Sequence, residues 1–267
     1  MQQTDLEHLY AWFREYTSRF TSDNSRTRTN LDLKTGHTLR VANNCRAIAE
    51  SLHLTKEQCV LAEVLGLFHD VGRFPQFMQY GTFRDGISRS HAEMSVEALD
   101  ADDVWRDFTD DERQLLTTAI LNHNQFTIPA DCTGDTLLFS QLIRDADKLD
   151  NLEMRAEGSS QRYTITLNAQ GTGDEVQFQE METVSPKVRE AILQHRCVLF
   201  ADVQTAADLA LIIIGTIFDL NFSYSFRQLH ETDCVERIFS WLPQNDSFRE
   251  MREAAEGFIE ERIAAQV

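Results

Sequence analysis

The sequence has few of the two residues that most often interrupt helices: 4 prolines and 11 glycines among 267 residues. Its apolar residues recur instead in long stripes with the period of an α-helix, about 3.6 residues. It contains no internal repeat and no low-complexity tract. We therefore expect an all-α protein.

Cysteine is also scarce and scattered. The number of cysteines is odd, and no two of them form a Cys-x-x-Cys pair. This pattern excludes a disulfide framework and a zinc ribbon, and it indicates a reduced, cytoplasmic protein. The five residues are Cys45, Cys59, Cys132, Cys197 and Cys234.

Basic residues are few: 25 lysines and arginines stand against 43 acidic residues, and the formal net charge is −18. So acidic a chain argues against a nucleic-acid polymer or an anionic membrane as the main partner. A small anionic substrate stays compatible with it, because a bound metal can invert the sign of the local field.

A long apolar run is missing as well. The most apolar segment, residues 209–220, follows Asp208, contains Asp219 next to its end and is too short to span a bilayer, so it predicts a buried helix. The first residues carry neither a basic segment nor an apolar core. We therefore expect no signal peptide.

What the sequence does contain is enough apolar material for a sizeable core, with 42% hydrophobic residues. We expect a single domain over residues 1–267.

The polar stretch 21–30 predicts a loop, 71–89 an irregular connection, and the alternating stretch 162–179 a small β-hairpin. Helices are predicted over 5–20, from 37 to 52, 55–70, from 91, from 110 to 123, 137–152, 186–200, 203–220, 232–242 and 246–264.

Capping boxes mark the starts of three of these helices. In each, a Ser or Thr is followed three residues later by Glu or Gln. The side chain of each of these two residues can then accept a hydrogen bond from the backbone N–H of the other. The boxes are Thr55–Gln58, Ser90–Glu93 and Thr109–Glu112.

The most informative stretch is 65–73, where an apolar run ends in His69-Asp70 and continues into Val71, Gly72 and Arg73. A buried histidine beside a buried aspartate is costly unless each has a partner or a metal. Neighbours on a helix point about 100° apart, so the two cannot simply pair with each other. The alternative is an ordinary helix end, with His69 favoured by the dipole, Gly72 in the C-cap region and Asp70 exposed.

The remaining metal-capable residues favour a metal site. Histidines and aspartates recur near helix ends or on buried helix faces. Four imidazoles and two carboxylates suit two closely spaced metals, with one carboxylate as a bridge. Nitrogen-rich ligands favour iron, manganese, cobalt or zinc over magnesium or calcium. The set is His37, His69, Asp70, His91, His123 and Asp147.

This ordered set resembles the motif of the HD-domain superfamily in its binuclear form. The flanks agree with it: Gly36-His37-Thr38 at the first histidine, His69-Asp70-Val71-Gly72-Arg73 at the dyad, and Asp145-Ala146-Asp147-Lys148 at the last ligand. The resemblance covers residues 30–155 and implies a helical bundle with its metal-binding core there. Residues 156–267 carry no motif, and we expect them to add the hairpin and helices that pack on the core.

The resemblance also implies roles for the six residues. His37, His69, Asp70 and Asp147 would hold one metal, and His91 and His123 a second one, with Asp70 as the bridge. Asp145 and Asp150 lie close to Asp147 in the sequence. The family pattern places the ligand at Asp147, and Asp150 could orient a neighbouring ligand.

The function expected from this set is hydrolysis of a phosphate ester, with a nucleotide as one option. Two divalent cations against two carboxylates leave a charge of about +2, which attracts a small phosphorylated substrate. A water activated by the metals would attack phosphorus, so Asp70 is expected to be catalytic. Arg73 is expected to bind a phosphate oxygen. The alternative for Arg73 is pairing with Asp85 or with a helix end.

Residues 74–86 connect two ligands and are expected to overhang the site. Two other functions stay open at this level. A small branch of the superfamily resembles this chain in its ligands and uses a mixed-valent di-iron centre as an oxygenase. A regulatory protein that binds a ligand without turnover is the third option, and an intact ligand set argues against it.

Overall fold

The computed structural model describes residues 3–157 and 182–265. The described residues form helices joined by turns and loops, with no strand among them, which confirms the predicted all-α class. The hairpin predicted at 162–179 lies outside the described residues. Of the described residues, 3–147 belong to one compact unit and 148–157 with 182–265 to another. The single domain over 1–267, and the packing of residues 156–267 on the core, stay predictions.

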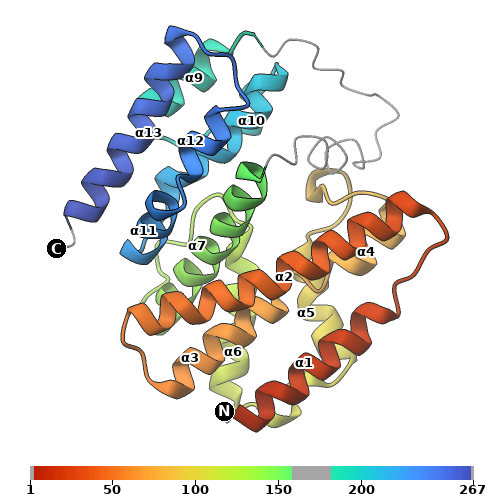
Figure 1. Ribbon diagram of the computed structural model, residues 1–267. Helices are drawn as coiled ribbons and strands as arrows, with labels where there is room; N and C mark the ends of the chain where they lie inside the picture. The colour runs from red at the N-terminus through yellow and green to blue at the C-terminus, as the bar shows by residue number, and fades with distance from the viewer. Residues whose placement is uncertain (1–2, 158–181, 266–267) are drawn as a thin grey trace. The chain divides into compact units, whose positions relative to one another are not determined.

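The first unit is built around two helices that run side by side, α2 (Ser25–Ser51) and α3 (Lys56–Phe68) (Figure 1). Gly66 permits their close approach, since a Cβ there would lie 2.6 Å from the Cα of Ala42. The other helices of this unit are α1 (Gln3–Ser18), α4 (Arg73–Tyr80), α5 (His91–Ala101), α6 (Asp110–His123) and the part of α7 (Gly134–Ala156) up to Asp147, with short 3₁₀ turns η1 (Asp85–Ile87) and η2 (Val104–Asp107).

Helix α2 is longer than the sequence predicted. It begins at Ser25, so the loop expected over 21–30 is wrong from that residue onward. The reason is a local cap: the side chain of Asn24 accepts hydrogen bonds from the backbone N–H groups of Arg26 and Thr27. The extra turns bury Asn30 and bring Lys34 onto the helix.

A second correction concerns the connection predicted over 71–89. Its first half forms α4, which ends where Gly81 takes a left-handed conformation with φ 67°. Pro75 did not prevent this helix, because it lies in the first turn, where its missing N–H is tolerated. Both groups of the capping box are present at Thr55–Gln58 and Thr109–Glu112. At Ser90 the hydroxyl accepts from the Glu93 N–H at 3.3 Å.

In the second unit, α13 (Asp246–Ala264) packs against three helices of the same unit: α9 (Pro186–Leu193), α11 (Ser223–Glu231) and α12 (Cys234–Phe239). Its bounds match the prediction, whereas the helix predicted over 186–200 ends at Leu193 and α11 was not predicted. No helix in the described part of the chain is long and apolar enough to cross a membrane. The other described elements of this unit are the part of α7 from Lys148, α10 (Ala206–Gly215) and the 3₁₀ turns η3 (Phe200–Asp202) and η4 (Thr216–Asp219).

Candidate metal centre

The six predicted ligands all lie in the first unit, and five segments carry them. His37 is on α2, the His69-Asp70 pair directly follows α3, His91 begins α5, and His123 ends α6. Asp147 is on α7.

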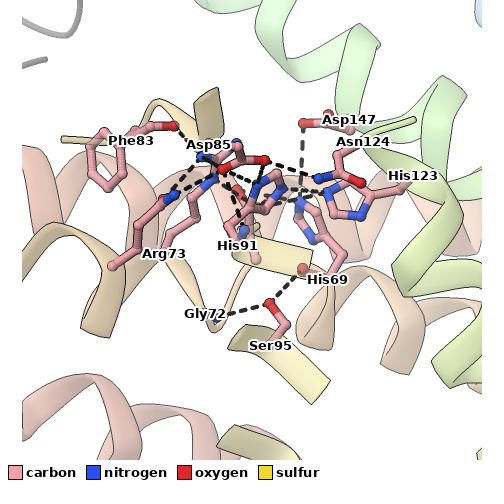
Figure 2. A network of polar contacts seen from close by, with 12 residues as sticks. His69, Gly72, Arg73, Phe83, Asp85, His91, Ser95, His123, Asn124 and Asp147 are labelled. Atoms are coloured by element: carbon pink, nitrogen blue, oxygen red, sulfur yellow. Dashed lines mark hydrogen bonds and ion pairs between the residues drawn. The ribbon is translucent and has the colours of Figure 1, made fainter. Parts of the chain in front are cut away.

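The chain turns sharply after α3, and Gly72 makes that turn possible. A Cβ on Gly72 would lie 2.3 Å from both the His91 oxygen and the Ser95 nitrogen, so only glycine allows the turn to touch α5. Ser95 completes the contact: its hydroxyl accepts from Gly72 N–H and donates to the His69 oxygen, both at 2.8 Å (Figure 2). Gly72 has φ −67°, so the alternative of a glycine C-cap is wrong. Asp70 is buried, not exposed.

The first ligand group comprises His37, His69 and Asp70, three buried residues whose ligand atoms lie within 4.8 Å of one another. Asp70 Oδ2 is 3.5 Å from His37 Nε2 and 3.6 Å from His69 Nε2. Asp147 approaches from α7, with its Oδ1 3.1 Å from His37 Nε2 and 4.0 Å from His69 Nε2. Asp147 Oδ1 thus lies near the two histidines of this group, and its role as a ligand stays a prediction.

The second ligand group comprises Asp70, His91 and His123, again all buried. Asp70 Oδ1 is 3.3 Å from His91 Nε2 and 3.9 Å from His123 Nε2, and the two Nε2 atoms are 2.9 Å apart. Asp70 therefore directs one oxygen to each group. That is the geometry of a bridging carboxylate.

The ring nitrogens test whether a metal fits. The Nδ1 atoms of His69 and His123 lie 2.7 and 2.6 Å from the carbonyl oxygens of Gly66 and Ile120, and His91 Nδ1 lies 2.7 Å from a carboxylate oxygen of Asp85. Each acceptor assigns the proton to Nδ1, and Nε2 keeps a lone pair. Three lone pairs then converge on Asp70 with no proton to share. His69 Nε2 is fully buried and has no hydrogen-bond partner. A cation is the group that fits between them.

The charge states agree with this assignment. Burial and the nearby Arg73 lower the pKa of His91 to about 4, and burial and the neighbouring His69 lower that of His123 to about 4. Burial alone would raise the pKa of Asp70, but Lys34 and the other cationic groups around it hold that pKa well below its usual range. The site therefore presents neutral imidazoles and an ionised carboxylate at pH 7, the forms that bind metals.

Asp85 organises the second ligand group, a role that sequence reasoning missed. Besides its contact with His91 Nδ1, it accepts a hydrogen bond from Asn124 Nδ2 at 3.0 Å (Figure 2). It also accepts one from Gln76 Nε2 at 2.8 Å. It fixes the orientation of the His91 ring. The sequence carried one usable signal, an aspartate in a ligand-connecting loop six residues before a predicted ligand.

Two cations lie against the carboxylates. Arg73 places Nε 3.3 Å from Asp70 Oδ1 and Nη1 3.4 Å from Asp85 Oδ1. Its pairing with Asp85, expected as an alternative, is therefore present together with a contact to Asp70. Lys34, which the sequence analysis did not single out, places Nζ 2.8 Å from Asp70 Oδ2. Residues 74–86, which were expected to overhang the site, include Phe83. Its ring stacks on that of Phe77, with 4.5 Å between the ring centroids.

Comparison with known families agrees with the resemblance seen in the sequence. The family model of the HD domain matches residues 35–152, a stretch that holds all six candidate ligands. No curated protein and no solved structure matches the chain. Buried histidines and aspartates in the matched stretch form groups that could hold a metal, as HD domains do. Residues 35–152 are thus similar to the HD domain, and this match supports membership in the HD-domain superfamily.

Proposed function

We propose that the protein is a phosphohydrolase that cleaves the phosphate ester of a small anionic substrate at a binuclear metal site. The observation that carries this proposal is the convergence of three Nε2 lone pairs on the two oxygens of Asp70, beside the guanidinium of Arg73. The lone pairs need cations, and a cationic site with an arginine at its edge suits a phosphate.

The residues that would hold the metals form two sets that share Asp70. His37, His69 and Asp147 would complete one site, and His91 and His123 the other. The nitrogen-rich set favours iron, manganese, cobalt or zinc. Such metals, when bound, polarise a phosphoryl oxygen and supply a nucleophilic hydroxide at neutral pH.

The protein's own groups have separate tasks. Asp70 joins the two ligand groups and sets their spacing. Asp85 keeps the proton of His91 on Nδ1, so that Nε2 stays available. Arg73 is a permanent cation at the edge of the site, and it would bind a non-bridging phosphate oxygen.

The test is an anaerobic assay of the manganese-loaded protein on a panel of phosphate esters. We expect phosphate release without oxygen, because water is the only co-substrate of a hydrolase. Arg73→Ala should lose about 2–5 kcal/mol of transition-state stabilisation in kcat/KM. Arg89→Ala is the matched control, since Arg89 is exposed and pairs with Glu97.

The same experiment distinguishes the oxygenase alternative. A di-iron oxygenase would release no phosphate from any ester in the panel, and its iron form would consume oxygen. That result would overturn the hydrolase proposal. Equal activity of Arg73→Ala and the wild type would leave hydrolysis intact but remove Arg73 from phosphate binding.

A further inference from the structure

Lys34 occupies a position that the six-ligand site leaves unexplained. It lies one turn before His37 on α2, and its ammonium is 2.8 Å from Asp70 Oδ2. That oxygen is the one directed at His37 and His69. A cation of the chain itself thus lies on the oxygen where the first metal would bind.

The side chain is neither fully buried nor free in solvent. It is 18% exposed, and its ammonium also lies 5.7 Å from the ring centroid of Phe83. The Arg73 guanidinium lies 6.0 Å from the centre of the same ring. Two basic side chains thus lie near the ring of Phe83, and they approach Asp70 on different oxygens: Lys34 on Oδ2 and Arg73 on Oδ1.

A bound metal would change the partner of Lys34. The metal and the ammonium carry like charges, and both require the same carboxylate oxygen, so each weakens the other's hold on it. A lysine side chain is a flexible four-carbon chain, so its ammonium can turn to another acceptor nearby. An anionic substrate drawn to the metals would bring such an acceptor to the edge of the site.

We propose that Lys34 is an exchangeable counterion: it neutralises Asp70 in the metal-free protein and transfers to the phosphate of the substrate when metal binds. The phosphate would then lie between Lys34 and Arg73, with Phe83 beneath both cations. This inference rests on the proposed function for the identity of the anion, but its competition with metal does not.

The proposal predicts two effects of opposite sign from one substitution. In Lys34→Met the competing cation is gone, so Mn²⁺ should bind metal-free protein about tenfold more tightly. The manganese-loaded variant should bind inorganic phosphate about tenfold more weakly, because one of two cations is missing. A merely structural role for Lys34 would instead weaken both.

Isothermal titration calorimetry measures both affinities, with Mn²⁺ and then inorganic phosphate as the titrants. Lys56→Met is the matched control, because it removes the same charge from an exposed residue at the far end of α3, roughly 20 Å of helix from His69. We expect no change in either affinity there. Lys34→Arg should restore phosphate binding. Lys34→Gln replaces Lys34→Met if circular dichroism shows that the methionine variant is unfolded.

Unchanged or weaker Mn²⁺ binding in the Lys34 variants would overturn the competition. Unchanged phosphate affinity would overturn the transfer to substrate. Both readings are independent of turnover: a wild-type protein that hydrolyses no phosphate ester would refute the proposed function, while the Mn²⁺ titration would still decide the role of Lys34.

Discussion

His69, His91 and His123 each have a hydrogen-bond acceptor for Nδ1, but the acceptors are of two kinds. The kind of acceptor follows from where each histidine lies on its helix. His69 and His123 stand at helix C-termini, and each directs Nδ1 to the carbonyl three residues earlier, in Gly66 and Ile120. His91 stands at a helix N-terminus. The free backbone groups there are N–H donors, not acceptors.

His91 therefore needs an acceptor from elsewhere, and the connecting segment supplies Asp85. A helix C-terminus thus provides a backbone carbonyl as the acceptor for a candidate metal-binding histidine. At a helix N-terminus the acceptor must come from another segment. The second ligand group depends on a side chain that can be removed by substitution, while the support of His69 is backbone and cannot.

The largest effect should come from the residue that the two groups share. Asp70→Ala removes one oxygen from each group, so we expect loss of both metals and of all activity, with the helices retained. Metal analysis of the purified variant and far-ultraviolet circular dichroism measure the two outcomes. Two metals per chain and normal turnover would show that Asp70 does not bridge.

Acid should destabilise the metal-free protein before it protonates the carboxylates. The pKa values of His91 and His123 are about 4 in the fold, against 6.5 for ordinary histidine. The unfolded chain therefore binds more protons than the native one between these values, and stability falls as the pH drops from about 6.5 toward 4. Each histidine should cost on the order of 2 kcal/mol between pH 7.5 and 5.

Urea unfolding in a chelator, repeated across this pH range, measures that loss. Saturating metal should raise the stability at each pH without reducing this loss, because metal keeps the native imidazoles deprotonated while the unfolded chain still takes up protons. Constant stability from pH 7.5 to 5 in the metal-free protein would contradict the neutral, buried histidines on which the site depends.

The contrast between the two supports can be tested at Asp85. Asp85→Asn should weaken the second metal about 10–100-fold, the usual cost of removing the partner of a ligand histidine, and leave the first site unchanged. A two-step manganese titration resolves the sites. Asp131→Asn, in an exposed loop of the same unit, is the control. Equal weakening of both steps would mean that the two groups do not have separate supports.

The smallest effect should come from the contact that holds the turn after α3 against α5. Ser95→Ala leaves the N–H of Gly72 and the carbonyl of His69 without this partner, at a cost of about 1–3 kcal/mol of unfolding free energy. Ser51→Ala, which removes a hydroxyl bonded within its own helix end, is the comparison. A loss no greater than that of Ser51→Ala would show that Ser95 does not hold the turn.

The helices with strong local signals were predictable. Thr55 and Thr109 start helices that the structure contains, and α13 has the expected bounds. The early start of α2 was hidden because residues 25–29 are polar and mostly exposed, so no apolar stripe marks them. Only the cap at Asn24 reveals it. Helix α4 was missed because glycines and a proline suggested a loop, although they stand at its ends and in its first turn.

In the candidate site too, the residues with a pattern along the sequence could be predicted, and those placed only by tertiary contacts could not. The six residues could be predicted because histidines and aspartates near helix ends or on buried helix faces form a recognisable order along the chain. Lys34 gave no signal, since lysine is an ordinary surface residue, and Asp85 gave only its place in the ligand-connecting segment. Only tertiary structure brings these two to Asp70 and His91. Gly72 was noticed, but its reason is contact with another helix, which no local pattern contains.

The ligand positions also bear on how the protein folds. Asp70 meets His37, 33 residues earlier, and His123, 53 residues later, so neither ligand group exists until separate helices have docked. A metal bound there recognises the native state alone and stabilises it in proportion to the logarithm of its free concentration above Kd. Its affinity is thus linked to the global unfolding of the first unit, and unfolding curves at graded metal concentrations would report both quantities at once.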